Sequence, residues 1–216
     1  RCEPNHVYSP WIAEWFNTLS NIPGIVLGVM GLITARRRMR GHHRQSTAIQ
    51  WAYFVPILVY AGSFVFHATL FYWGQLLDEL PMVFGSCYLH YIATPPRYRN
   101  TAAPILFLVA VGITTAMAAW PASPLPLQLS YAATVAALIF RSARINGAHP
   151  AVRATGILSF AAVIYNMGSA LWITDQNWCE VVQPLHFHAW WHLLTSIGTY
   201  AWIQFAAVAQ AEEMKQ

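Results

Sequence analysis

The chain has 216 residues, of which 56% are hydrophobic and only 9% are charged. Ordinary soluble domains carry about 25% charged residues, so this composition excludes a typical soluble globule as well as a disordered or collagen-like chain. Ten Trp, ten Tyr and eleven Phe residues give an aromatic content typical of proteins at membrane interfaces. We therefore expect lipid to be the solvent of this chain.

Seven stretches are long and apolar enough to form membrane-spanning helices, which need about 20 mostly apolar residues. In chain order they cover residues 11–35, 49–71, 76–93, 102–120, 125–140, 152–173 and 185–209. The sequence therefore predicts an all-α, polytopic seven-helix bundle over residues 11–209. A short outer segment, residues 1–10, precedes the bundle, and a cytoplasmic tail, residues 210–216, follows it.

The basic residues predict the orientation of this bundle. Seven spans place alternate loops on opposite sides of the membrane, and eleven of the twelve Lys and Arg residues then share one side. The positive-inside rule makes that side cytoplasmic and places the N-terminus outside. Positive charge that sorts by membrane side forms no groove for nucleic acid, and nothing in the sequence indicates a protein partner. The eleven residues are Arg36, Arg37, Arg38, Arg40, Arg44, Arg97, Arg99, Arg141, Arg144, Arg153 and Lys215, and only Arg1 lies outside.

Four ionisable residues fall near the outer ends of three spans, where a charge is costly and indicates a functional site. They are His67, Asp78, His188 and His192. His188 and His192 are four residues apart, so both lie on one helix face and can bind a single ion. With His67 they supply three nitrogens, the ligand set of catalytic zinc, which lowers the pKa of a bound water to about 7.

Two further residues complete a candidate catalytic site. Asp78 can act as general base towards water and then as general acid towards a leaving amine. Ser63 precedes His67 by four residues on the same helix face, where its hydroxyl can hold a carbonyl oxygen or an oxyanion. The alternative for any single His is an interhelical hydrogen bond, and a pair such as His188 and His192 also arises by chance among nine His. The combination at one depth favours metal chemistry.

The outer side carries two more patterns. Cys2 and Cys179 both fall there, so a disulfide between them is plausible in an oxidising compartment. Glu3, Asn5 and Glu14 are hard oxygen donors, the type that suits calcium. The alternative is a solvated terminus for Glu3 and Asn5, and for Glu14 a carboxylate that complements a helix dipole.

Five motifs together resemble the alkaline ceramidases, integral membrane amidases of a superfamily that includes the adiponectin-receptor-like proteins. The motifs are Cys-Glu-x-Asn at residues 2–5, IAEWFNTLSN at 12–21, GSFVFHATL at 62–70, QLLDELPM at 75–82 and FHAWWHLL at 187–194. The resemblance implies that His67, His188 and His192 bind zinc, with Ser63 and Asp78 as catalytic neighbours.

The same resemblance bears on the outer segment. It implies a disulfide between Cys2 and Cys179, and calcium binding by the outer segment, which matches Glu3, Asn5 and Glu14. The family calcium motif opens with Asp and Trp, whereas Arg1 stands at the Trp position here and the Asp position precedes the chain.

The sequence thus predicts a zinc-dependent amidase that hydrolyses the N-acyl bond of ceramides, located in the endoplasmic reticulum or Golgi membrane if the protein is eukaryotic. One alternative is an adiponectin-receptor-like receptor with the same metal site. That branch has a cytoplasmic N-terminus, which conflicts with the distribution of basic residues. A second alternative is a small transporter with a His and Asp proton relay. Transporters commonly show paired repeats or broken helices, and this sequence shows neither.

Overall fold

The computed structural model describes residues 2–38, 43–121, 123–148 and 152–213. Three of the Lys and Arg residues used to predict the orientation, Arg1, Arg40 and Lys215, therefore lie outside the described residues. Within the described ranges, helices and their connections make up the whole fold, and no strand is present. The long helices are α2 (Ile22–Arg38), α3 (His43–Thr69), α4 (Tyr72–Ile92), α5 (Arg99–Ala119), α6 (Leu125–Ala148), α7 (Val152–Asn177) and α9 (Phe187–Glu213). The short elements are α1 (Trp15–Leu19), α8 (Cys179–Val182) and two 3-10 turns, Pro96–Tyr98 and Gln183–Leu185.

Four helical stretches of the described chain are long and apolar enough to cross a membrane. They are Trp15–Arg37, Thr47–Thr69, Pro96–Ala119 and Ala154–Asn177. The helices α4, α6 and α9 occupy the positions of the other three predicted spans, but they are not among these four. Helix α9 also continues beyond residue 209 to Glu213, so the helix includes part of the predicted tail.

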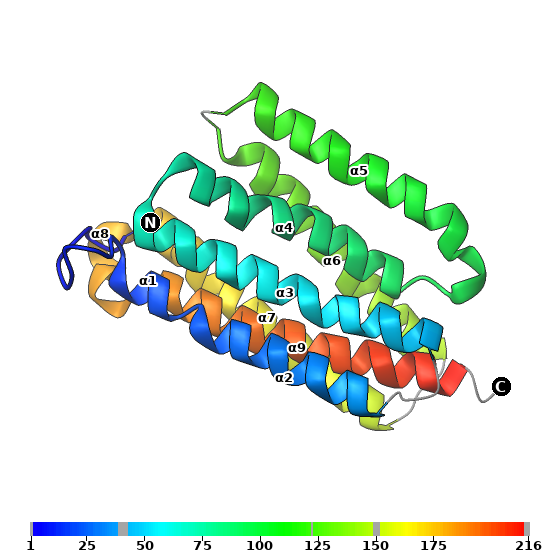
Figure 1. Ribbon diagram of the computed structural model, residues 1–216. Coiled ribbons are helices and arrows are strands. Elements are labelled where there is room, and N and C mark those ends of the chain that lie inside the picture. Colours follow the sequence, from blue (N-terminus) through cyan, green and yellow to red (C-terminus); the bar gives the residue numbers. More distant parts are fainter. Residues whose placement is uncertain (1, 39–42, 122, 149–151, 214–216) are drawn as a thin grey trace.

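The long helices run side by side as an elongated bundle, with α5 on its outside against α4 and α6 (Figure 1). Helix α3 packs against both α2 and α4, and α7 packs against α9. Glycines on α2 permit the close approach of α3. A Cβ atom at Gly24 or Gly31 would overlap the ring of Tyr60 or Tyr53, respectively. Small residues of this kind are typical of helix interfaces in lipid, where close backbone packing replaces the hydrophobic effect.

The two ends of the bundle have different interiors. The N-terminal segment, α1 and α8 lie at one end, and the C-terminal ends of α2 and α9 lie at the other (Figure 1). The apolar core, which includes Ile49, Ile92 and Phe205, belongs to the second end. The interior of the first end is polar and includes Asn17 and His67, both of which are 1% exposed. Because buried polar groups are costly without partners, their concentration at one end indicates a functional site there.

Candidate metal centre

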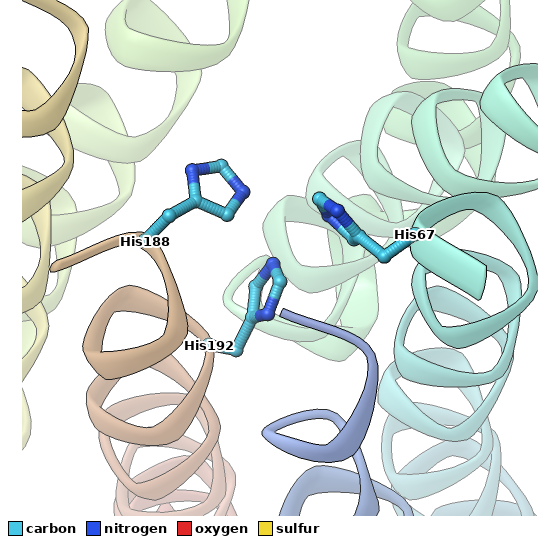
Figure 2. A group of neighbouring side chains, drawn as sticks. All are labelled: His67, His188 and His192. Carbon is cyan, nitrogen blue, oxygen red and sulfur yellow. The ribbon is translucent and has the colours of Figure 1, made fainter. Parts of the chain in front are cut away.

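Three buried histidines from two helices converge in this polar interior. His67 comes from the last turn of α3, and His188 and His192 come from the first two turns of α9. Figure 2 shows their rings pointing towards one another, with centroid separations of 4.8 to 5.1 Å. One nitrogen from each ring lies within 4.8 Å of the other two. The nitrogen ligands of a tetrahedral zinc lie roughly 3.3 Å apart, so small rotations of the rings would close the site around such an ion.

The N-terminal segment holds His67 in place from one side. Helix α3 ends at Thr69, and Leu70 follows in the left-handed region with φ 56°, a conformation typical of a helix C-terminus. The backbone N–H groups of Ala13 and Glu14 donate to the carbonyl oxygens of Ala68 and His67 at 2.9 and 3.0 Å. This pairing brings Glu14 alongside His67, where its carboxylate Oε2 lies 2.6 Å from His67 Nδ1. The other ring nitrogen of His67 is thereby left for a metal.

Helix α1 and the residues after it surround His192 in a similar way. His192 Nδ1 lies 3.1 Å from the carbonyl oxygen of Asn17 and 2.8 Å from Ser20 Oγ. An Nδ1–H group that donates to a carbonyl leaves Nε2 as the free electron pair that metals bind. The Asn17 carbonyl beside Nδ1 therefore favours this tautomer.

Of the two predicted catalytic neighbours, Ser63 contacts this cluster and Asp78 lies on the neighbouring helix α4. Ser63 is 3% exposed, and its Oγ lies 3.5 Å from His192 Nε2. Asp78 is half-buried on α4. A Cβ atom built on Gly62, the neighbour of Ser63, would lie only 3.0 Å from the backbone nitrogen of Asp78. The structure therefore places Asp78 directly across the α3–α4 contact from the segment that carries Ser63.

The outer segment is organised mainly by Glu3 and a disulfide. Glu3 accepts hydrogen bonds from the backbone N–H groups of Phe16 and Asn17 at 2.7 and 2.8 Å, and so caps the first turn of α1. Burial raises the pKa of the Glu3 carboxyl, and the nearby Glu14 carboxylate adds to this rise. Asn5 is exposed in a turn. Cys2 and Cys179 form the predicted disulfide, with a Cα–Cα distance of 5.1 Å.

The histidines have neighbours whose contacts the sequence did not predict. Asn17 and Ser20 lie in the IAEWFNTLSN motif, but the sequence assigned neither a role. Glu14 was considered as a calcium ligand or a helix-initial carboxylate, and its contact with His67 was not predicted. The sequence assigned no role to Asp175, although its Oδ2 lies 3.9 Å from His188 Nδ1. The packing of α1 and α7 against the other helices decides which of these side chains faces which histidine.

Fold and site together define a helical membrane protein with a buried three-histidine cluster suited to bind a metal ion. The chain belongs to the ceramidase family, because the Ceramidase family model matches residues 1–216. It is therefore an enzyme of this family, as the motifs predicted.

Relatives from distant organisms agree with this assignment. Alkaline ceramidase 3 of Mus musculus is 31% identical over 95% of this chain and 80% of its own length. Alkaline ceramidase of Arabidopsis thaliana is 28% identical over 98% of this chain and 83% of its own length. Alkaline ceramidase 1 of Homo sapiens is 29% identical over 99% of this chain and 83% of its own length. The receptor-like alternative is not favoured by these comparisons.

Proposed function

We propose that this enzyme hydrolyses the N-acyl amide bond of ceramides and releases a sphingoid base and a free fatty acid. The observation that carries the proposal is the cluster of His67, His188 and His192, buried in a chain whose relatives are named alkaline ceramidases. Imidazole nitrogens suit zinc, and each of these histidines lies beside an oxygen acceptor on another segment. These side chains therefore fit the proposed ion.

Zinc bound to three histidines supplies an acidic water and polarises a substrate carbonyl. The protein's own residues supply the remaining steps. The Asp78 carboxylate takes a proton from the attacking water while the water oxygen bonds to the amide carbon. It then delivers that proton to the nitrogen as the C–N bond breaks, so the amine leaves neutral. The Ser63 hydroxyl, next to His192 Nε2, donates to the oxygen that becomes negative during the attack.

The proposed membrane arrangement suits this substrate. We propose seven spans with the N-terminus outside, which is the lumen in the endoplasmic reticulum or Golgi. The histidine cluster would then lie near the lumenal leaflet of the membrane. A ceramide can then keep both hydrocarbon chains in lipid while its amide reaches the polar end of the bundle. Large apolar residues such as Phe107 and Leu108 on α5 are 60% and 67% exposed, as expected for a helix that faces lipid.

Calcium binding by Glu3, Asn5 and Glu14 stays part of the proposal. Two neighbouring buried carboxylates repel each other, and a divalent cation between them would remove that cost. In the described structure Glu3 and Glu14 also contact protein groups, so a calcium ion would have to share their oxygens with Phe16, Asn17 and His67. No catalytic step depends on this ion.

Ceramide hydrolysis by purified variants tests the proposal. His188→Ala should lose both bound zinc and activity. Asp78→Asn should keep its zinc and lose about 100- to 10,000-fold in kcat, the typical contribution of a general acid–base group. His90→Gln is a matched control, because the His90 ring contacts only the Thr134 carbonyl among the described hydrogen bonds and glutamine can still donate to it. Full activity in His188→Ala or Asp78→Asn would contradict the proposal.

A further inference from the structure

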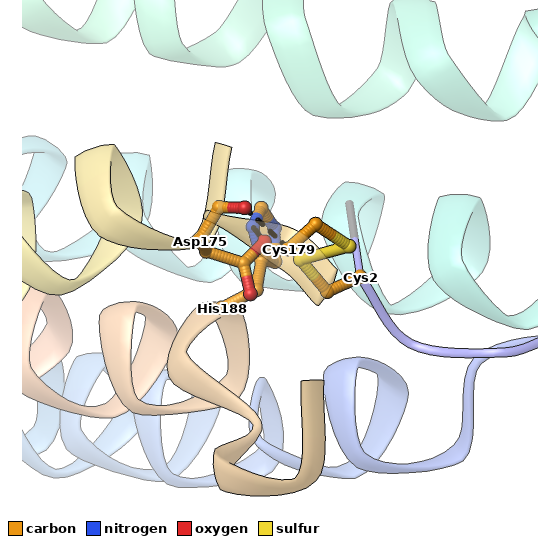
Figure 3. The surroundings of a disulfide bond; sticks show 4 residues. All are labelled: Cys2, Asp175, Cys179 and His188. Carbon is orange, nitrogen blue, oxygen red and sulfur yellow. Dashed lines mark hydrogen bonds and ion pairs between the residues drawn. A yellow bond between two sulfur atoms is a disulfide. The ribbon is translucent and has the colours of Figure 1, made fainter. Parts of the chain in front are cut away.

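Asp175 is a buried carboxylate that the proposed reaction does not use. It lies in the last turn of α7 and is 2% exposed. Figure 3 shows it beside His188, with the disulfide of Cys2 and Cys179 next to both. A carboxylate is costly to bury unless it is hydrogen-bonded or paired, so its position calls for a physical explanation.

Asp175 contacts the disulfide as well as His188. Its backbone carbonyl oxygen lies 2.9 Å from Cys2 Sγ, and backbone groups of Cys2 and His188 lie near its carboxylate. Among the described residues, no hydrogen-bond donor reaches its Oδ2 atom. Because Cys2 is bonded to Cys179 and His188 belongs to α9, Asp175 contacts two separate parts of the chain. Its Oδ2 atom then lies 3.9 Å from His188 Nδ1.

This arrangement repeats what surrounds the other two histidines. His67 Nδ1 lies against the Glu14 carboxylate, and His192 Nδ1 lies against the carbonyl of Asn17. Metal-binding imidazoles donate their second ring N–H to such acceptors, which sets the tautomer and the ring orientation. A decrease of roughly 1 Å in the separation would bring Asp175 Oδ2 and His188 Nδ1 to an ordinary hydrogen-bond distance.

We propose that Asp175 is the positioning residue for His188. Its Oδ2 atom accepts the Nδ1–H of His188 and so directs Nε2 towards the metal. The inference rests on the metal site of the proposed function and adds to it a third acceptor, from a helix that supplies no ligand. It also connects the disulfide to the metal site through one residue.

Asp175→Asn separates positioning from structural support. Asparagine has nearly the size and shape of aspartate, so the packing around residue 175 survives. Its amide oxygen is a weaker acceptor than a carboxylate, and its NH₂ group, where it faces His188 Nδ1, presents a donor that favours the wrong tautomer. A purely structural role predicts that this variant resembles the wild type. A positioning role predicts weaker zinc binding in a protein of nearly unchanged stability.

The measurements are the zinc dissociation constant from chelator competition, the visible spectrum of the cobalt-substituted protein and the melting temperature. We expect Asp175→Asn to raise the dissociation constant about 10- to 100-fold and to alter the cobalt spectrum. Asp175→Ala should show a similar loss together with lower stability. Glu180→Gln, an exposed acid beside Cys179, and Ser142→Ala, which removes a buried hydrogen bond to Trp202 at the other end of the bundle, should leave zinc affinity unchanged.

The outcomes separate this inference from the proposed function. Wild-type zinc affinity and an unchanged cobalt spectrum in Asp175→Asn would overturn the inference alone. Failure of the wild-type protein itself to bind zinc would overturn the metal centre, and this inference with it. If Asp175→Ala does not fold, the comparison of Asp175→Asn with the wild type still decides the question.

Discussion

Gly62→Ala should move Asp78 relative to the three buried histidines without removing any functional group. Gly62 lies where α3 touches α4, and a Cβ atom there would overlap the Leu77 carbonyl oxygen and lie 2.5 Å from the carbonyl carbon. Ordinary contacts between carbon atoms measure about 3.5–4.0 Å, so the α4 backbone must move by roughly 1 Å or more. The obstacle is backbone rather than a flexible side chain, and rotation of a side chain cannot relieve it.

The expected result is a large loss of rate with little loss of metal. A misplacement of about 1 Å can cost roughly 100-fold in rate, so kcat for ceramide hydrolysis should fall by about that factor. Overpacking costs about 1–3 kcal/mol of stability, and the higher helix propensity of alanine offsets up to about 1 kcal/mol of it. Zinc stoichiometry should not change, because His67 is on α3 and the other two ligands are on α9.

Gly112→Ala is the matched control for this variant. Gly112 lies within α5, and a Cβ atom there would meet nothing within 4 Å. Gly112→Ala therefore introduces the same methyl group into a helix without a clash, and its activity should equal that of the wild type. Wild-type kcat in Gly62→Ala, or an equal loss in Gly112→Ala, would refute the inferred placement of Asp78 beside the site.

Two further predictions concern groups around the ligands. Glu14→Gln removes the carboxylate that contacts His67 Nδ1, so it should weaken zinc binding about 10- to 100-fold in a chelator competition. The same loss is expected in calcium-free buffer. An unchanged zinc affinity would contradict this role of Glu14. Calcium at about 100 times its dissociation constant should stabilise the protein by about 2.7 kcal/mol, which corresponds to a rise of roughly 5–10 °C in melting temperature over a sample with EGTA. The rise should disappear in Glu3→Gln with Asn5→Ala and persist in Glu180→Gln, and its absence from the wild type would contradict the calcium site.

The histidine cluster could be predicted from the sequence because its signal lies in residue spacing and in the order of the spans. The spacing of His188 and His192 matches one helix face, and the alternation of spans then brings His67 to the same end of the bundle. Ser63 follows from the same argument, since it lies one helical turn from His67. Prediction of the disulfide required only that Cys2 and Cys179 be assigned to the same side of the membrane.

The partners of the histidines could not be predicted because they depend on tertiary packing. Glu14 lies against His67 because two backbone hydrogen bonds join residues 13–14 to the end of α3. Asp175 lies against His188 because α7 packs along α9, and no sequence spacing relates these two residues. A carboxylate before a helix, or at the end of one, has many possible roles, and only the packing selects one.

Removal and return of metal on one sample of purified protein tests the central claim most directly. Fatty acid release from ceramide and zinc content are measured in the same sample before chelation, after chelation and after zinc is returned. The account predicts one zinc per chain, activity that falls in proportion to the zinc removed, and recovery when zinc is restored. Full hydrolysis by the metal-free protein, or no hydrolysis by folded, zinc-loaded protein, would contradict it.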